Sequence, residues 1–333
     1  MKTAIRFKIA ISEFWEARSQ KKHEPLAVCR IGVIACADGL FYSEKLAVES
    51  TLSRNAQKLL LTFLCGFCYY VAVFIIFINR TQNQPMQLHE TSAVQGDWLF
   101  RWRSYLPLFL IAIMIPGVLC HQYPGNSHFY DLCWEIGCLC VSFFGLFVRC
   151  LTVGFVPRGT SGRNTSGQIA DSLNTTGMYS LLRNPLYLGN FLMILGVVTM
   201  LAVNAFWLPI IYALAFWLYY ERIIMCEEAF LGKKFGQVYH DYAASTSAFV
   251  PNFNRWKKPE LPFSFRSVLR REYSSFFALV SAMFTVEIVG DIIVEHRFIL
   301  DPIWVIFFLF SLGIYLSLRT IKKKTAWLTV EGR

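Results

Sequence analysis

Long apolar segments are the feature that most constrains what this chain can fold into. A spanning helix needs about 20 mostly apolar residues, because each residue adds about 1.5 Å against about 30 Å of hydrocarbon. Seven segments reach or approach that length: 59–78, 105–120, 132–155, 186–203, 205–220, 275–294 and 303–318. Strand alternation is absent, and backbone groups in lipid must be paired within the protein. The sequence therefore predicts an all-α, polytopic transmembrane helix bundle of about seven spans.

The composition agrees with a chain that folds in lipid. Charged residues make up 16% of the chain, against roughly 25% in a soluble domain. No cleavable signal peptide is expected, since the first apolar segment begins late and residues 1–58 are mixed in charge. The net charge of +10 suits basic cytoplasmic loops and an anionic lipid partner. No basic stripe interleaved with aromatic residues indicates a nucleic-acid partner.

The cysteines do not predict a metal site. Cys65 and Cys68 form a CxxC pair, and Cys138 and Cys140 form a CxC pair. Both pairs lie in apolar segments without a nearby histidine, where cysteine is usually a small apolar filler. We therefore predict no metal.

Charge in the loops predicts the orientation of the bundle. Loop 121–130 contains no lysine or arginine, whereas loop 156–185 carries three arginines and loop 221–272 carries both lysines and arginines. By the positive-inside rule the first loop should face outward, and the other two, with the basic stretch 322–324, should face the cytoplasm. Two cytoplasmic flanks on the nearly continuous apolar run 186–220 require a tight helical hairpin.

The N-terminal region does not follow this rule. Counting back from the outward loop places residues 1–58 outside, although they carry ten lysines and arginines. Either 26–41 forms a marginal or re-entrant eighth segment, which Arg30 and Asp38 make costly, or the rule fails here. We divide the chain into a basic N-terminal region, N-terminal transmembrane helices, a core with the candidate site, and a C-terminal helix pair with a basic tail: 1–58, 59–150, 151–258 and 259–333.

A polar cluster stands at the entrance to the hairpin. The loop before it is rich in glycine, serine, threonine and asparagine and carries Arg158 and Arg163, which suits an oxyanion holder or an ordinary solvated loop. Pro185 near a helix start costs nothing, because its missing N–H would be unpaired there. Arg183 and Tyr187 would share a helical face if the helix extends back that far.

A second polar cluster follows the hairpin. Glu227 and Glu228 are adjacent carboxylates just beyond the apolar segment. After a turn at Phe235-Gly236, Tyr239 and Tyr242 fall on one helical face. Carboxylates can bind ribose hydroxyls or an amino group, and aromatic rings can bind adenine and a positive sulfur, so the cluster suits an adenosine-bearing sulfonium. The alternative is a charged interfacial helix with an aromatic belt.

The two clusters together resemble one family. The arrangement G-x-Y-x-x-x-R-[HN]-P-x-Y-x-G, hairpin, E-E, F-G-x-x-Y-x-x-Y and a proline-bearing aromatic end spans residues 152–253. It is similar to the isoprenylcysteine carboxyl methyltransferase superfamily, which includes the phospholipid N-methyltransferases. The resemblance implies an integral membrane enzyme that binds S-adenosylmethionine at the cytosolic face. The cofactor-binding residues that it implies are Gly177, Tyr179, Arg183, Asn184, Pro185, Tyr187, Gly189, Glu227, Glu228, Tyr239 and Tyr242.

Asn184 is where this sequence departs from the family motif, which has histidine at that place. An asparagine can replace histidine as a hydrogen-bond donor, but it cannot carry a proton. If the family histidine moves protons, this protein does not use the position in that way.

The acceptor is expected to be a membrane lipid. A carboxylate or phosphate oxygen needs no general base, and no histidine dyad is well placed, His240 being interpreted as structural. The stretch "TSGRNT…LNTTGMYSLLRNPLYLGN" also resembles the bacterial branch that methylates the 1-phosphate of a lipid A precursor. That resemblance implies a bacterial inner-membrane enzyme whose site faces the cytoplasm, with Arg158, Arg163 and Arg183 neutralising the phosphate as catalytic residues.

Other functions stay open at this point. The acceptor could instead be a prenylcysteine carboxyl, a phospholipid amine or a small thiol. A protein of another class, such as a non-catalytic membrane carrier or assembly protein, could use the same scaffold. The sequence does not predict the oligomeric state.

Three carboxylates recur every fourth residue within a C-terminal apolar segment and so share one helix face: Glu287, Asp291 and Glu295. Carboxylates within a membrane are costly and are candidates for function. Because this face lies far from the predicted cofactor site, we expect packing against polar groups of the bundle such as Arg149 or Arg297.

Overall fold

The computed structural model describes residues 114–115, 117–118, 121–157, 159–160, 170–203, 206–298 and 300–333. The elements in this part are helical: η1 Pro124–Asn126, α6 His128–Phe155, α7 Met178–Leu181, α8 Pro185–Met200, α9 Trp207–Phe235, α10 Gln237–Ser245, η2 Phe253–Arg255, α11 Phe265–Glu295 and α12 Pro302–Lys324. The predicted segment 59–78, most of segment 105–120 and the basic region 1–58 lie outside the described residues.

Four of these helices are long and apolar enough to cross a membrane, namely α6, α9, α11 and α12. The chain is thus an all-α integral membrane protein. Each predicted apolar segment within the described residues forms a helix, and α8, with 16 residues, is shorter than the other four. The predicted segment 205–220 is only part of α9, because the helix continues through its polar second half to Phe235.

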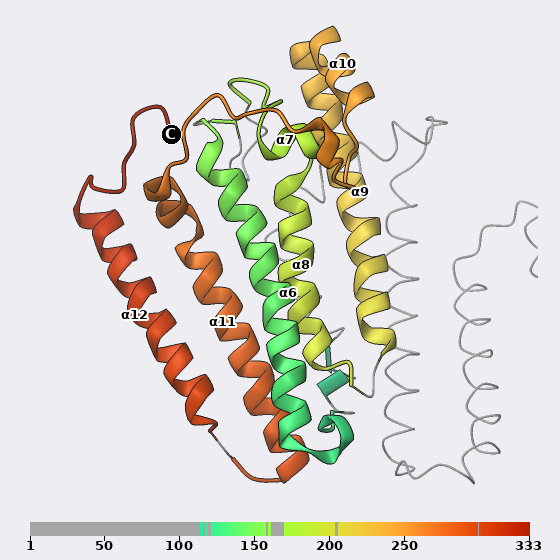
Figure 1. The fold of residues 1–333 in the computed structure, drawn as a ribbon, viewed down its shortest axis with the longest axis vertical. Helices are drawn as coiled ribbons and strands as arrows, with labels where there is room; N and C mark the ends of the chain where they lie inside the picture. Colours follow the sequence, from blue (N-terminus) through green and yellow to red (C-terminus); the bar gives the residue numbers. More distant parts are fainter. Residues whose placement is uncertain are drawn as a thin grey trace, which may run out of the picture. The chain divides into compact units, whose positions relative to one another are not determined.

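The helices run antiparallel to their neighbours in the chain, so their ends form two groups (Figure 1). One end of the bundle holds the end of α6, the start of α8, the end of α9, the start of α11 and the end of α12, with α7 and α10 beyond them. The opposite end holds η1 and the α8–α9 and α11–α12 connections. The described parts of the two basic loops that were predicted to share a face therefore lie at the same end.

Helices α8 and α9 form the predicted hairpin. The chain between them is only residues 201–206, and the two helices share a core in which Leu201 and Leu208 are fully buried. Tyr212 of α9 stacks on Phe191 of α8 and donates a hydrogen bond of 3.1 Å to its carbonyl oxygen. The hairpin thus brings the start of α8 beside the second half of α9.

Small residues let α6 and α8 approach closely. A Cβ atom added to Gly145 of α6 would lie 2.6 Å from the carbonyl oxygen of Gly189 in α8. One turn away, Ser142 donates a hydrogen bond of 2.9 Å to the carbonyl oxygen of Met193. Small side chains at helix crossings are typical of membrane proteins, where close backbone contact replaces hydrophobic burial as the packing force.

The buried side chain of Arg149 joins three helices, one turn along α6 from Gly145. Arg149 of α6 donates from Nε and Nη2 to both carboxylate oxygens of Glu272 in α11, at 2.9 and 2.8 Å. Its Nη1 donates to Oδ1 of Asn190 in α8 at 2.6 Å. This bidentate arrangement satisfies both charges away from water and positions α8 against its two neighbours.

The expected packing of the α11 carboxylates against polar groups of the bundle is confirmed for Glu295 and Asp291. Glu295 lies 3.4 Å from Arg297, as predicted. Arg149 pairs with Glu272 instead, because Glu272 and Arg149 lie toward the same end of the bundle. Asp291 accepts a hydrogen bond of 2.8 Å from the hydroxyl of Tyr123.

Candidate functional site

Arg183 connects the start of the hairpin to two later segments. It lies between α7 and α8, where its Nη1 donates to the carbonyl oxygens of Ala243 and Thr246 at 2.7 and 3.1 Å. Its backbone N–H donates to the carbonyl oxygen of Ser247 at 2.9 Å. Its Nη2 lies 2.9 Å from Oε1 of Glu228 in α9. Three of its groups are therefore engaged by the protein itself.

Tyr187 of α8 contacts Glu227, the residue that precedes Glu228 on α9. Its hydroxyl donates a hydrogen bond of 2.7 Å to Oε1 of Glu227, and its ring lies 4.7 Å from that of Tyr220. Helix α8 begins at Pro185, so Arg183 precedes it and does not share a helical face with Tyr187. Both nevertheless reach the glutamate pair, and the two sequence clusters converge at one end of the bundle.

The local geometry at the start of α8 agrees with the sequence motif. Pro185 occupies the first helical turn, as its missing N–H allows. Asn184 precedes it as the N-cap residue, and its Nδ2 donates to the carbonyl oxygen of Ala248 at 3.1 Å. At the position of the family histidine, the asparagine of this chain is thus a hydrogen-bond donor.

A tyrosine cluster covers the same end of the bundle. Gly236, with a φ of 56°, forms the predicted turn between α9 and α10. Tyr239 is buried and its ring lies 6.3 Å from that of Tyr242, whose hydroxyl donates to the carbonyl oxygen of Tyr179 at 2.7 Å. Burial raises the pKa of Tyr179 to about 12 and also raises the pKa values of the other two. All three hydroxyls therefore keep their protons at neutral pH.

Two of the predicted site residues are glycines whose role is in backbone conformation and helix packing. Gly177 has a φ of 59° at the start of α7, and its N–H donates to the carbonyl oxygen of Lys257 at 2.9 Å. Gly189 faces α6, where an added Cβ would lie 2.5 Å from Cγ of Arg149. Arg158 and Arg163 lie outside the described residues. Their predicted roles, like the cofactor contacts of the other residues, stay predictions.

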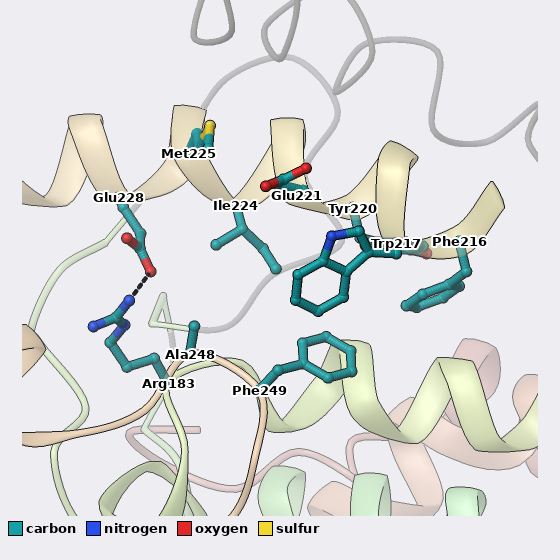
Figure 2. A pocket seen from close by; sticks show the side chains of 10 residues that line it. All are labelled: Arg183, Phe216, Trp217, Tyr220, Glu221, Ile224, Met225, Glu228, Ala248 and Phe249. Atoms are coloured by element: carbon teal, nitrogen blue, oxygen red, sulfur yellow. Dashed lines mark ion pairs between the residues drawn. The ribbon is translucent and has the colours of Figure 1, made fainter. Parts of the chain in front are cut away.

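A cavity of about 220 Å³ opens beside the Arg183–Glu228 pair. Figure 2 shows this pair at one end and the rings of Phe216, Trp217 and Phe249 at the other. The lining residues come from α9 and from the segments before α8 and after α10: Arg183, Phe216, Trp217, Tyr220, Glu221, Ile224, Met225, Glu228, Ala248 and Phe249. The cavity is thus polar at one end and aromatic at the other.

Most of this lining was missed because the apolar segment hid it. Trp217 and Tyr220 fall inside the predicted span 205–220 and were not considered as site residues. A helix continued through residue 228 would have placed Tyr220, Ile224 and Glu228 on one face, since they are four apart. That spacing was the available signal.

Three polar atoms at the site are buried without a hydrogen bond of good geometry within the described residues: Arg183 Nε, Glu228 Oε1 and Tyr239 Oη. The Tyr239 hydroxyl and the Glu228 carboxylate nevertheless lie beside each other. Glu228 Oε1 lies near Arg183 Nη2, but as an ion pair without hydrogen-bond alignment. Buried polar groups are nearly always hydrogen-bonded, so orphaned donors and acceptors mark places where a ligand can bind. A carboxylate, a guanidinium and a phenol suit the hydroxyls, amino groups and carboxylate of S-adenosylmethionine.

Comparison with known proteins gives a consistent set of relatives. The family described as phospholipid methyltransferase matches residues 136–238, from α6 into α10. The protein-S-isoprenylcysteine O-methyltransferase A of Arabidopsis thaliana is 33% identical over 218 residues, which cover 62% of this chain and 98% of the relative.

Two bacterial resistance proteins are also similar. The nickel-cobalt-cadmium resistance protein NccN of Alcaligenes xylosoxydans xylosoxydans is 32% identical over 156 residues, 47% of this chain and 65% of the relative. The cobalt-zinc-cadmium resistance protein CzcN of Cupriavidus metallidurans is 41% identical over 95 residues, 28% of this chain and 41% of the relative. The chain thus spans less than two thirds of either resistance protein. No solved structure matches.

Proposed function

The chain belongs to the superfamily of the phospholipid and isoprenylcysteine methyltransferases, and on that premise we propose that it transfers a methyl group from S-adenosylmethionine to an acceptor in the membrane. The single observation that carries the proposal is the contact between the two polar clusters. Arg183 contacts Glu228 at the polar end of the cavity, and Tyr187 contacts the adjacent Glu227.

The protein groups at the polar end have the chemistry for the cofactor. When bound, S-adenosylmethionine supplies a methyl group on a positive sulfur. A nucleophile of the acceptor attacks the methyl carbon in line with the carbon–sulfur bond, and the sulfur leaves as a neutral thioether. The glutamates can accept hydrogen bonds from ribose hydroxyls or from the adenine amino group, and their charge complements the sulfonium. The aromatic rings of the cavity can stabilise the same positive charge and exclude water from the reacting atoms.

The aromatic end of the cavity suits an acceptor with an apolar body. Trp217 lies in α9, where Leu214 and Leu218 are also exposed. An acceptor that arrives from the lipid would place its polar head toward Glu228 and its chain along these residues. We accordingly propose a lipid acceptor and a site at the cytoplasmic face, as the basic residues at this end favour.

O-methylation of a lipid phosphate, such as the 1-phosphate of lipid A in a bacterial inner membrane, is the more specific version of this proposal. It depends on Arg158 and Arg163, because Arg183 is already held by Glu228 and two backbone carbonyls. None of the relatives described above is named for lipid A. Prenylcysteine carboxyls, phospholipid amines and small thiols are therefore tested beside it.

A second candidate function comes from the two bacterial relatives. Their names refer to resistance to nickel, cobalt, zinc and cadmium. We propose, as the alternative, that this chain contributes to metal tolerance, with methyl transfer or as a non-catalytic membrane protein. Metal tolerance of cells that carry the Glu228→Gln protein separates the two cases, since only the catalytic version requires an intact cavity.

The test of the main proposal is transfer of labelled methyl from S-adenosylmethionine to membranes that contain the protein, followed by mass spectrometry of lipids, peptides and small thiols. We expect one added methyl group on one acceptor class with the wild type and with Glu260→Gln, which changes an exposed residue outside the cavity. Glu228→Gln should reduce the transfer strongly. Equal labelling by all three proteins would refute the site, and no labelling by the wild type would favour the non-catalytic alternative.

A further inference from the structure

A second polar site lies at the end of the bundle away from the cavity, where α6 begins and α11 ends (Figure 1). Asp131 and Glu135 of α6 approach Glu287 of α11, and one carboxylate oxygen from each lies within 4.8 Å of the others. Asp131 is 7% exposed and Glu135 is 5% exposed. Asp131 and Glu135 are thus buried acids in a membrane protein, whereas Glu287 is half-buried, and the methyl-transfer proposal uses none of the three.

Within the part of the chain that the structure describes, lysines and arginines do not balance the charges of these three acids. Within the described residues, no lysine or arginine forms an ion pair with any of the three. The two arginines that the sequence suggested as partners are engaged elsewhere, since Arg149 pairs with Glu272 and Arg297 with Glu295. Three ionised carboxylates this close together repel strongly in apolar surroundings, so either protons or a bound cation must compensate them.

One oxygen of Glu135 points to a missing ligand. The indole Nε1 of Trp304 donates to Glu135 Oε2 at 3.1 Å and so orients the carboxylate. The other oxygen, Oε1, is buried, and within the described part of the chain its one available donor is a proton on the neighbouring Glu287 carboxyl. A buried oxygen that lacks a donor is uncommon in native proteins, and a metal ion is one of the few partners that can satisfy it.

We propose that Asp131, Glu135 and Glu287 bind a divalent cation. Two ligands of one ion cannot be farther apart than twice the ion–oxygen distance, which is about 5.2 Å for Ca²⁺ and about 4.2 Å for Mg²⁺. The spacing of up to 4.8 Å therefore lies within the pairwise limit for an ion of Ca²⁺ size. A set of carboxylate oxygens selects hard cations such as Ca²⁺ and Mn²⁺ over metals that prefer thiolate.

Further groups support the three ligands. Asp291 lies one turn beyond Glu287 on α11, is buried, and is held by the hydroxyl of Tyr123. Hydrogen bonds of this kind orient the surroundings of a metal site before the ion arrives. The cation would cross-link the beginning of α6 to the end of α11, while Arg149 and Glu272 join the same two helices near their other ends.

The proposal is tested with Mn²⁺ on the full chain in detergent, after removal of metals with a chelator. Free Mn²⁺ is followed by electron paramagnetic resonance. We expect one saturable Mn²⁺ per chain, displaced by Ca²⁺, and at least a tenfold loss of affinity in Glu135→Gln. Glu295→Gln is the matched control, because Glu295 lies on the same face of α11 and pairs with Arg297 at the surface.

A second measurement keeps the test decisive if Glu135→Gln folds poorly. Saturating Mn²⁺ should raise the unfolding temperature of the wild type, because a ligand that binds only the folded state stabilises it. Asp131→Asn should lose most of that rise. Absence of saturable binding in the wild type, or equal affinity in Glu135→Gln, overturns the proposal and leaves shared protons as the account of the cluster.

Discussion

Arg183 and Glu228, which stand in two different polar motifs of the sequence, form an ion pair of 2.9 Å across the α8–α9 hairpin. The contact joins the segment before α8 to the second half of α9 and sets the polar end of the cavity. One residue earlier on α9, Glu227 accepts a hydrogen bond from the hydroxyl of Tyr187. The pair of glutamates is therefore positioned by two residues of the polar cluster at the entrance to the hairpin.

Glu228→Gln should weaken binding of S-adenosylmethionine by roughly 10- to 100-fold. The substitution keeps the size of the side chain and removes its charge, and a hydrogen bond to a charged group contributes about 1.5–3 kcal/mol. Calorimetric titration of the detergent-purified protein measures the change. Glu260→Gln should bind like the wild type, and an unchanged affinity in Glu228→Gln would remove Glu228 from the site.

Asn184→His should retain the fold and the affinity for S-adenosylmethionine, whereas Asn184→Asp should lose both in part. The reason is that Asn184 Nδ2 donates to the carbonyl oxygen of Ala248, and a carboxylate in its place would face that oxygen without a donor. Unfolding temperature and cofactor titration measure the two effects. If aspartate is tolerated as well as histidine, the hydrogen bond does not position this segment.

Gly145→Ala should destabilise the protein by about 1–3 kcal/mol, which is typical of overpacking. The added methyl group would lie 2.6 Å from backbone atoms of Gly189 and Met193, which cannot move aside as a flexible side chain would. Gly137→Ala, on the same helix, has nothing within 4 Å of the new atom and should be neutral or slightly stabilising. Equal unfolding temperatures for both variants would contradict the close α6–α8 contact.

The order and type of the helices could be predicted because each depends on nearby residues. An apolar run is enough to indicate a span, and Pro185 marks the start of α8 because of its own missing N–H. The convergence of the two clusters was also predictable, since a short hairpin connection brings its flanks together. The exact end of α9 was not, because its polar half looked like a loop when judged by hydrophobicity alone.

Pairings between distant helices could not be predicted in the same way. Glu272 is the partner of Arg149 because α6 and α11 are antiparallel neighbours, and nothing local to either residue encodes that choice. The approach of Glu287 to Asp131 and Glu135 depends on the same packing. The carboxylates of α11 were recognisable as unusual from their helical spacing, but their partners required the tertiary structure.

Glu272→Gln should cost about 3–5 kcal/mol, because it leaves Arg149 as a buried charge without its counterion. Thermal or denaturant unfolding in detergent measures the loss. Arg297→Ala is the comparison, since it breaks an exposed ion pair with Glu295, a kind of pair that usually contributes about 0–1 kcal/mol. If both variants lose the same small amount, the Arg149 network does not hold α6, α8 and α11 together.

Trp217→Ala should raise the KM for the acceptor and leave the affinity for S-adenosylmethionine nearly unchanged. Trp217 lies at the aromatic end of the cavity, away from the Arg183–Glu228 pair, so its loss removes contact area for an apolar acceptor. Trp327→Ala is the matched control, since Trp327 is 52% exposed against 54% for Trp217 but does not line the cavity. Kinetics with varied acceptor and calorimetry with the cofactor separate the two effects. A loss of cofactor affinity equal to the change in KM would mean that the two ends of the cavity do not bind different molecules.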